Sequence, residues 1–535
     1  MKHIISIIAA LMLVLTVFAG CSAQKADTAE STSPSAVVTQ TVASDAASDD
    51  AMFTDRDKEI GYSEAESTII ALADGQTSVN GAGAVVEDNV VTISEEGTYI
   101  FSGSLSNGQI VVDASDDAKI QIVLNGVDIS NESSAAIYVK NADKVFITTA
   151  NGSENTLSVT GEYVAIDDNN IDAAIFAKSD LTLNGAGTLT INADYGHGVV
   201  SKDDLAVTSG TYKIVSASSG LSGKNSVRIA DGTFALAAGT DGIHSENEDD
   251  TTLGFVYISG GTINISAEDD GIHAETSVTI LGGKLDITKS YEGIEGLTIN
   301  ISGGDITVSA SDDGLNAAGG NDGSGGEGKA AMQAVDGCLI TISGGNLTVD
   351  AVGDGIDSNG SLEISGGVIT VSGPTDSGNG TFDYNGTAVI TGGTLLGAGS
   401  SGMAQGFSDS STQGSILYVL TDTQKAGTTV TLKDESGNVI AQFTPAKQFQ
   451  TVNISAKELT NGSTYTLTVG TQEYSVEMTA ITYSNGSGMG MGGGQMPSGG
   501  GQMPAGGQGG GPGGKGQAQT GGAGTDATSS ATVAQ

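Results

Sequence analysis

Apolar and polar residues alternate in short runs along most of the chain, and a pair of glycines interrupts many of these runs. Two examples read Val-Tyr-Ile-Ser-Gly-Gly-Thr-Ile-Asn-Ile at 256–265 and Val-Thr-Ile-Leu-Gly-Gly-Lys-Leu-Asp-Ile at 278–287. Alternation with a period of two is typical of strands with one buried face. No amphipathic helical segment of useful length follows residue 75. We therefore expect an all-β fold, and repeats that combine a helix with a strand are disfavoured.

The glycine pairs recur at a nearly constant interval. Their first members are Gly260, Gly282, Gly303, Gly344, Gly366 and Gly392, at spacings of 22, 21, 41, 22 and 26 residues. The value of 41 fits one repeat plus an insertion, which we assign to residues 318–336. A second signature, an acidic residue followed by glycine and an apolar residue, has degenerate copies at Gly198 and Gly220, with Ala136 and Ala174 in the same place earlier.

Superposing the repeats brings apolar side chains into columns. The four columns are Ile258, Ile280, Ile301, Ile342, Ile364 and Ile390; Ile263, Leu285, Ile306, Leu347, Ile369 and Leu395; Ile265, Ile287, Val308, Val349 and Val371; and Ile243, Ile272, Ile294, Leu315 and Ile356. Coils of this length with short strands and glycine-rich corners indicate a parallel, right-handed β-helix whose coils lie about 4.8 Å apart. We place it, with its N-terminal cap, at residues 59–404.

The two ends of the repeat differ from its middle. Residues 59–110 should cap the first coil, beginning with a short helical piece at 62–73 and continuing with strands at 90–93 and 99–101. Residues 405–483 predict a small C-terminal β domain or cap, because turn signals such as Asn461-Gly462 separate alternating runs. Residues 484–535 are rich in glycine and methionine, and we expect them to be disordered.

The first residues predict export. Lys2 and His3 precede an apolar run at 4–18, and small residues lead to Cys21, which resembles a bacterial lipobox. We expect residues 1–21 to be a lipoprotein signal peptide and Cys21 to be lipidated, so that the protein is extracellular and anchored to the cell membrane or outer surface. Residues 22–58 would be a flexible tether. The other cysteine, Cys338, should be a small core residue.

The net charge of the chain limits which classes of molecule it can bind. The chain has 20 basic and 63 acidic residues, which gives 20 − 63 = −43. Nucleic-acid binding depends on Lys and Arg neutralising phosphates, so nucleic acid is excluded as a partner. We expect a monomer.

Stacking turns the acidic repeat residues into a ladder. Asp241, Asp270, Glu292, Asp313 and Asp354 precede the repeat glycines, and His244, His273, Glu295, Asn316 and Asp357 follow them by two positions. Like charges about 5 Å apart repel by about 1 kcal/mol in water and about 3–4 kcal/mol at an effective dielectric near 20. The carboxylates should therefore hold a hard cation or stay protonated; a solvated acidic edge is the plainer alternative.

Oxygen ligands from acidic residues and from glycine-rich corners suit calcium. We expect the metal ligands among Asp241, Asp269, Asp270, Glu292, Glu295, Asp312, Asp313, Asp354 and Asp357. His244 and His273 share a register that could suggest zinc, although a third and a fourth ligand of suitable geometry would be needed.

Several motifs resemble a known family. Asp-Asp-Gly-Ile-His-Ala at 269–274, Tyr-Glu-Gly-Ile-Glu-Gly at 291–296 and Asp-Asp-Gly-Leu-Asn-Ala at 312–317 are similar to the carbohydrate-binding parallel β-helix family of bacterial surface proteins. The resemblance covers roughly residues 59–405. It implies a pectate-lyase-like fold, calcium between coils, and non-catalytic binding of plant cell-wall polysaccharide that is cellulose-like or polygalacturonate-like.

The resemblance also raises the question of the glycan-binding residues. The chain has no Trp, so an aromatic platform would need Tyr195, Tyr212, Tyr257, Tyr291, Phe382 or Tyr384. We expect Tyr195, Tyr291, His244 and His273 to contact ligand.

Two alternatives remain. A β-helix lyase or hydrolase would use Asp167-Asp168, Gly196-His197-Gly198 and Val227-Arg228-Ile229, but their offsets within the repeat point them to different sides of the helix. A calcium-stiffened adhesin or surface structural protein without a glycan ligand is the other.

Overall fold

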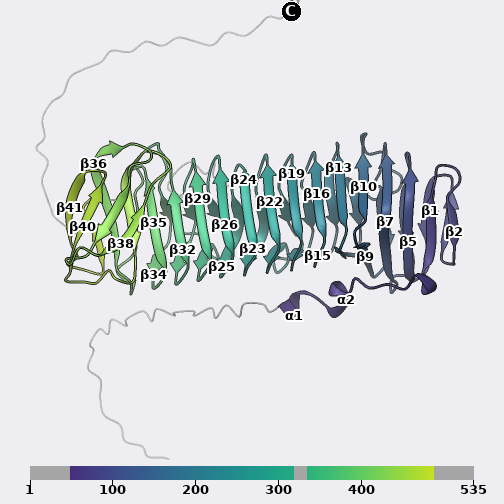
Figure 1. Cartoon of the computed structure of the whole chain (residues 1–535), viewed down its shortest axis with the longest axis horizontal. Helices are drawn as coiled ribbons and strands as arrows, with labels where there is room; N and C mark the ends of the chain where they lie inside the picture. Colours follow the sequence, from purple (N-terminus) through teal and green to yellow (C-terminus); the bar gives the residue numbers. More distant parts are fainter. Residues whose placement is uncertain (1–48, 319–333, 487–535) are drawn as a thin grey trace, which may run out of the picture. The chain divides into compact units, whose positions relative to one another are not determined.

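The structure is a computed structural model that describes residues 49–318 and 334–486. It is a parallel β-solenoid of about 11 turns that is nearly all β, so the expected fold class is confirmed (Figure 1). The predicted signal peptide, Cys21, most of the tether and nearly all of the glycine- and methionine-rich tail lie outside the described residues.

Each coil contributes three short strands, which form three rows. The ladder row runs through β4 (Val90–Ile93), β6 (Gln109–Asp113), β8 (Ile137–Asn141), β11 (Ala173–Ala177), β14 (His197–Ser201), β17 (Leu221–Gly223), β20 (Ile243–Ser245), the first parts of β23 (Ile272–Ile280) and β25 (Ile294–Ile301), β27 (Leu315–Ala317), β30 (Ile356–Ser358) and β33 (Phe382–Tyr384).

The second row, here called the strap row, follows the ladder row in each coil. It runs through the first part of β7 (Lys119–Asn131), β9 (Lys144–Thr149), β12 (Asp180–Gly185), β15 (Asp204–Val207), β18 (Ser226–Ile229), β21 (Phe255–Ile258), the second parts of β23 and β25, β28 (Leu339–Ile342), β31 (Ser361–Ile364) and β34 (Ala388–Ile390).

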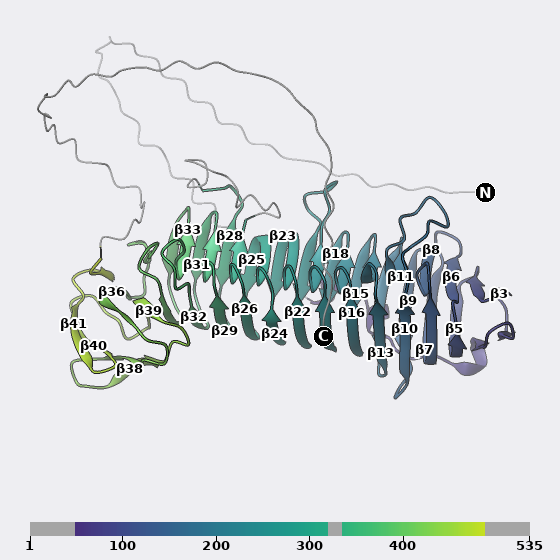
Figure 2. The same cartoon turned by 90° about the horizontal axis from the view of Figure 1, so that it is seen from above.

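The third row can be followed strand by strand in Figures 1 and 2. It runs through the second part of β7, β10 (Glu154–Val159), β13 (Thr188–Ala193), β16 (Thr211–Ser216), β19 (Thr233–Ala238), β22 (Thr262–Ala267), β24 (Lys284–Lys289), β26 (Asp305–Ala310), β29 (Asn346–Ala351), β32 (Val368–Ser372) and β35 (Thr394–Gly399).

The strand registers confirm all four predicted apolar columns. In one of them Ile258 pairs with Ile280, and the pairing continues through Ile301, Ile342, Ile364 and Ile390. These side chains are buried and line the interior of the solenoid. β28 pairs directly with β25, so the 41-residue spacing is one coil carrying an insertion, of which residues 319–333 lie outside the described residues. Cys338 is buried in this core, as expected.

The two glycine signatures have different physical causes. The second member of a Gly-Gly pair, such as Gly283, has a φ of 89°, a left-handed conformation that glycine adopts without strain. The glycine of the acidic signature is required for space instead. A Cβ atom on Gly293 would lie 2.2 Å from the carbonyl oxygen of Gly314 in the next coil. At this position the two coils can therefore stack closely because glycine has no side chain.

The N-terminal cap differs from the prediction in its helix. Within 62–73 only Glu64–Glu66 forms a 3-10 turn, and Thr68–Leu72 is strand β1, which pairs in parallel with β5 (Gly97–Leu105). The helical interpretation was wrong because Ile70 and Leu72 alternate with exposed residues, a period of two rather than of a helix.

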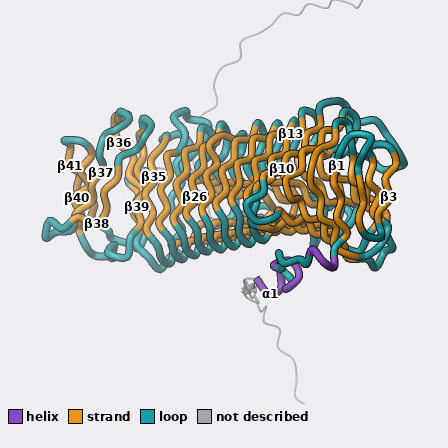
Figure 3. Tube along the Cα trace, turned by 45° about the vertical axis from the view of Figure 1, so that its right-hand side comes forward, coloured by secondary structure: helices purple, strands orange, loops and turns teal. Residues whose placement is uncertain are grey.

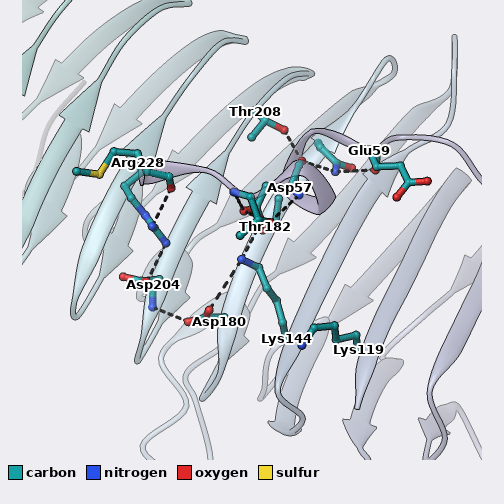
Figure 4. Close-up of polar contacts among 12 residues, drawn as sticks. Asp57, Glu59, Lys119, Lys144, Asp180, Thr182, Asp204, Thr208 and Arg228 are labelled. Atoms are coloured by element: carbon teal, nitrogen blue, oxygen red, sulfur yellow. Dashed lines mark hydrogen bonds and ion pairs between the residues drawn. The ribbon is translucent and has the colours of Figure 1, made fainter. Parts of the chain in front are cut away.

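The predicted tether is too long at its C-terminal end. Residues 49–59, here called the strap, include the short helices α1 (Asp49–Met52) and α2 (Asp55–Lys58) and lie against the outside of the strap row (Figures 3 and 4). Asp57 is buried and forms an ion pair of 2.8 Å with Lys144. Further along the strap, Arg228 donates to the carbonyl oxygen of Met52 at 2.8 Å. The strap is thus bound by side chains from several successive coils.

The C-terminal end closes the open edge of the last coil. β39 (Phe449–Ser455) pairs in antiparallel fashion with β35 and with β36 (Ser415–Gln424). A separate four-stranded antiparallel sheet contains β37 (Val430–Lys433), β38 (Val439–Phe443), β40 (Thr464–Val469) and β41 (Gln472–Glu477). The expected small β domain is therefore present, and it protects a strand edge that would otherwise invite aggregation.

Candidate functional site

Two polar columns run side by side along the ladder row. In the column after the glycines, His244 pairs with His273, and the pairing continues through Glu295, Asn316 and Asp357 as the sequence predicts. The structure adds a sixth member, Asp383, which pairs with Asp357. Sequence comparison of the repeats missed it because Thr381 and Phe382 replace the glycine and the aliphatic residue of the motif.

The carboxylates of the column before the glycines accept hydrogen bonds from the backbone of the following coil. Oδ1 of Asp241 accepts the backbone N–H of Asp270 at 3.3 Å, and Oδ1 of Asp270 accepts that of Glu292 at 3.3 Å. Further along, Oδ1 of Asp313 accepts the N–H of Asp354 at 2.6 Å. These carboxylates therefore tie successive coils together, since each satisfies a buried amide of the following coil.

The half of the ladder that contains histidine is internally neutralised. Nδ1 of His273 lies 3.1 Å from Asp270 and 2.7 Å from Glu295. Burial opposes the charged imidazolium, but these two carboxylates prevail and raise the pKa of His273 to about 11. Burial also acts against ionised Glu295, yet the contact with His273 lowers its pKa. For Asp270, burial and the charge of Glu295 raise the pKa to about 7.

His244 continues this arrangement in the preceding coil. Its ring stacks on that of His273 with centroids 5.1 Å apart and planes 12° apart. Its Nδ1 lies 2.8 Å from Asp241, and this contact lowers the pKa of Asp241 although burial acts in the opposite direction. Both histidines are therefore partnered by carboxylates, and Asp270, His273 and Glu295 bring three ligand atoms within 4.8 Å of one another, so the zinc alternative stays a prediction.

The other half of the ladder has no basic partner among the described residues. Asp313, Asp354 and Asp357 each present a carboxylate oxygen, and the three oxygens lie within 4.8 Å of one another. Burial, reinforced by neighbouring carboxylates, raises the pKa of Asp313 to about 7 and that of Asp354 to about 8. The same causes raise the pKa of Asp357 well above its ordinary value. The three carboxylates cannot all be ionised at neutral pH unless a cation compensates them.

Two buried oxygens of the column after the glycines lack a hydrogen-bond partner within the described residues, and Asn316, which carries one of them, pairs with Asp357 of the cluster. They are Oδ1 of Asn316 and Oε1 of Glu295, on side chains that are 6% and 3% exposed. Glu292, whose pKa burial and Glu295 raise to about 9, accepts a hydrogen bond from the Asn316 amide at 2.8 Å. An amide oxygen beside several carboxylates is the donor set of a hard divalent cation, so these residues fit calcium.

The two remaining predicted metal ligands are Asp269 and Asp312. Asp269 is exposed, whereas Asp312 is half-buried. The carboxylate of Asp312 lies by the hydroxyl of Tyr291 and raises its pKa to about 12. Tyr291 and Tyr195 are 44% and 41% exposed and remain available to a ligand.

The aromatic platform that we considered is not available in full. Tyr212, Tyr257 and Phe382 are each 1% exposed, and Tyr384 is half-buried. Tyr212 and Phe382 pack in the core of the solenoid, whereas Tyr257 is covered by the strap, with the Phe53 ring 6.1 Å away. The platform interpretation was therefore wrong for three of the six aromatic residues.

The motif residues of the enzymatic alternative are separated. Arg228 lies on the strap row, where it contacts Asp204 at 2.8 Å, whereas His197 lies on the ladder row. A second acidic cluster, Asp180, Asp203 and Asp204, was not anticipated from the sequence. Lys144 and Arg228 lie beside it, so cationic side chains already compensate its charge.

A comparison with known protein families finds a match within the β-solenoid. Residues 87–337 match the family described as "Carbohydrate-binding domain-containing protein". This part of the chain is similar to that family. The matched residues contain the ladder from Asp241 to Asn316, and the same columns continue beyond them to Asp383.

Two relatives illustrate the match. A carbohydrate-binding domain-containing protein of Acetivibrio thermocellus is 39% identical over 137 residues, which are 25% of this chain and 48% of the relative. The chain thus spans about half the length of this curated relative. A solved structure described as a polysaccharide lyase-like protein from C. thermocellum, in a gadolinium derivative, is 33% identical with a TM-score of 0.40, covering 46% of this chain and 96% of that chain.

In the described part of the chain, no helix is long and apolar enough to cross a membrane.

Proposed function

We propose that this protein is a calcium-stabilised, non-catalytic binder of plant cell-wall polysaccharide, cellulose-like or polygalacturonate-like, held at the bacterial surface by a lipid on Cys21. The similarity to the carbohydrate-binding family supports the ligand class. The acidic half of the ladder supports calcium, and the lipobox-like sequence supports the anchor. The separation of Arg228 from His197 supports binding without catalysis.

One observation carries the calcium part of the proposal. Asp313, Asp354 and Asp357 gather three carboxylates without a basic partner among the described residues, next to the unpartnered Oδ1 of Asn316. These residues would hold the ion. Bound calcium would supply the positive charge that lets the carboxylates ionise together, and it would link two successive coils.

The same ion would explain how an acidic protein binds an acidic glycan. Polygalacturonate and the ladder are both anionic, so the ladder alone would repel it. Asp313, Asp354 and Asp357 would hold the ion, and calcium bound there would supply a ligand site for the glycan carboxylate. A neutral, cellulose-like glycan would depend instead on exposed rings such as Tyr195 and Tyr291.

Glycan binding with and without calcium tests the proposal. We expect residues 22–535 to bind polygalacturonate or cellulose saturably in calcium, and binding of polygalacturonate at the ladder to be lost in chelator. Asp354→Asn with Asp357→Asn should remove this component. The matched control is Asp305→Asn with Glu363→Gln, which removes two charges from exposed positions in the other two rows. Binding that is equal in both double variants would contradict the proposal.

The non-catalytic and anchoring parts need their own tests. Prolonged incubation with polygalacturonate should release no unsaturated or shortened products, and any calcium-dependent release would contradict a pure binding role. In the native host, Cys21→Ser should move the protein from the membrane fraction to the medium.

A further inference from the structure

Four lysines form a second column on the ladder row, at its N-terminal end. They are Lys140, Lys178, Lys202 and Lys224, and each lies four residues after the repeat position held by Ala136, Ala174, Gly198 or Gly220. The chain as a whole has only 20 basic residues against 63 acidic ones. Four basic residues in successive coils are therefore unusual in a chain that is otherwise strongly acidic.

The strand registers place these lysines directly above one another. Val139 pairs with Ala177, Ala177 with Ser201, and Ser201 with Gly223, and each lysine is the next residue. The backbone hydrogen bonds continue the same register, because the N–H of Lys178, Lys202 and Lys224 donates to the preceding coil at 3.0, 2.8 and 2.9 Å. The spacing of the column is therefore the coil spacing, about 4.8 Å.

The two inner lysines form no ion pair with the described residues. Lys140 pairs with Asp113 at 2.7 Å, and Lys224 pairs with the largely exposed Asp249 at 2.6 Å. Lys178 and Lys202 are exposed, and no carboxylate of the described residues lies within ion-pair distance of either. Like charges directly opposite one another on neighbouring strands are destabilising. The mutual repulsion of Lys178 and Lys202 does not stabilise the fold, which suggests that the stack serves a ligand.

The surroundings of the column suit an extended ligand. Lys202 and Lys224 line an open hollow of about 330 Å³ together with His197 and His244, and the carboxylates of Glu246, Glu248 and Asp249 line it as well. Beside it, Lys202 Nζ lies 5.5 Å from the ring of Phe176, which belongs to a buried aromatic cluster with Tyr138. β8 and β11, which begin the column, are neighbours in Figure 2. The side of the solenoid that carries the lysine column is therefore well packed.

The column ends where its charge reverses. By the same register, Glu246 follows Lys224, and Glu275 follows Glu246. The lysine column is consequently confined to the coils before the acidic ladder. It is a site of its own, because its charge is opposite to that of the calcium cluster around Asp354.

We propose that the lysine column binds the carboxylate groups of a polyuronate chain that lies along the solenoid axis. This inference rests on the proposed carbohydrate-binding function and specifies its ligand as an acidic glycan. The length of a pyranose residue is comparable with the coil spacing, so the uronate carboxylates that face the solenoid lie at multiples of this spacing and can meet lysines of the column. An ammonium–carboxylate contact needs no metal, so this binding is independent of calcium, unlike that at the acidic ladder.

Calorimetry in chelator tests the column without interference from calcium. The probe is a de-esterified oligogalacturonate long enough to span four coils, titrated into residues 22–535 at low ionic strength. We expect saturable binding that disappears at high salt, because exposed charges are screened. The fully methyl-esterified oligomer, which has no charge, should not bind.

Two double variants with the same net charge locate the site. Lys178→Glu with Lys202→Glu should weaken binding about tenfold or more. The matched control is Lys213→Glu with Lys284→Glu, because both residues are exposed on the third row, and it should bind within about twofold of the wild type. If the first variant does not fold, Lys178→Gln with Lys202→Gln replaces it.

Each contrary outcome identifies what fails. Equal loss in both double variants, or none in either, would overturn the column as the site. Binding of polygalacturonate only in calcium would overturn the column while the proposed function stands, whereas no glycan binding in either condition would overturn both. Dextran sulfate binding as tightly as oligogalacturonate, with the same loss in the column variant, would show a general polyanion surface and overturn the uronate assignment.

Discussion

At the scale of the residue, a ladder side chain is governed by the neighbours that stacking gives it in the adjacent coils. His273 and Asn316 occupy the same column two coils apart, yet their surroundings differ in kind. The imidazole of His273 supplies a positive charge to Asp270 and Glu295. Asn316 supplies none to the cluster of Asp313, Asp354 and Asp357, which therefore needs protons or a cation.

The first prediction exchanges these two environments. His273→Asn places the residue of the acidic half at the histidine position and removes the imidazolium beside Asp270 and Glu295. We expect the variant to bind an additional calcium ion and its melting temperature to depend more steeply on calcium than that of the wild type. His197→Asn, which lies on the same row but outside the carboxylate ladder, is the control. An unchanged calcium stoichiometry in His273→Asn would contradict the role assigned to the imidazolium.

The second prediction concerns pH in the absence of calcium. The pKa values of Asp313, Asp354 and Glu292 are raised to about 7, 8 and 9, above those of the unfolded chain, so the folded state binds protons more tightly. Their stabilisation is complete at pH below the unfolded pKa values and is lost as pH rises through 7 to 9. In chelator, the melting temperature should therefore fall by several degrees between pH 5 and pH 9.

Saturating calcium provides the internal comparison. It should flatten this dependence, because bound ion replaces the protons that the carboxylates otherwise need. A melting temperature in chelator that rises over the same pH interval would show that the ladder carboxylates are not held protonated.

At the scale of the element, the strap shows how a short segment is held by a regular surface. Asp57 is buried between Lys144 and Thr182, while its carbonyl oxygen accepts hydrogen bonds from Thr208 and Asn184 (Figure 4). Removing one partner of a buried ion pair costs about 3–5 kcal/mol, because the other charge is left uncompensated. The docking of the strap should therefore depend strongly on this one carboxylate.

The third prediction follows from this contact. Asp57→Ala should release the strap and expose Arg56 and Lys58 to trypsin, so that limited proteolysis cleaves the variant there much faster than the wild type. Asp55→Ala is the control, because Asp55 is an exposed carboxylate in the same helix. Equal cleavage rates for Asp57→Ala and wild type would mean that the ion pair with Lys144 does not hold the strap.

The contacts of the strap, unlike the apolar columns, could not be predicted from the sequence. The apolar columns were predictable to the residue because parallel stacking repeats one pattern in every coil. Asp57 offers only a local signal, a capping box with Thr54. Its partners Lys144 and Thr182 lie far away in sequence and carry no repeat signature, so their convergence required the three-dimensional fold. Asp383 was hidden for another reason, because the last coils lose the glycine that identifies the motif.

At the scale of the whole molecule, charge is arranged by coil along the ladder row. Lysines occupy the coils of β8 to β17, histidines balanced by carboxylates follow, and unbalanced carboxylates occupy the coils of β27 to β33. The net charge of −43 does not reveal this change from basic to acidic residues along the row. A polyuronate chain would therefore meet direct cationic contacts at one end and calcium-dependent ones at the other.

A calorimetric calcium titration of residues 22–535 tests the central claim most directly, that the unbalanced carboxylates form a cation site. The wild type is compared with Asp313→Asn/Asp354→Asn and with the charge-matched control Asp305→Asn/Glu363→Gln. We predict saturable binding in the wild type and the control, and its loss in the first variant. Absence of calcium binding by the wild type, or equal affinity in all three proteins, would contradict the account.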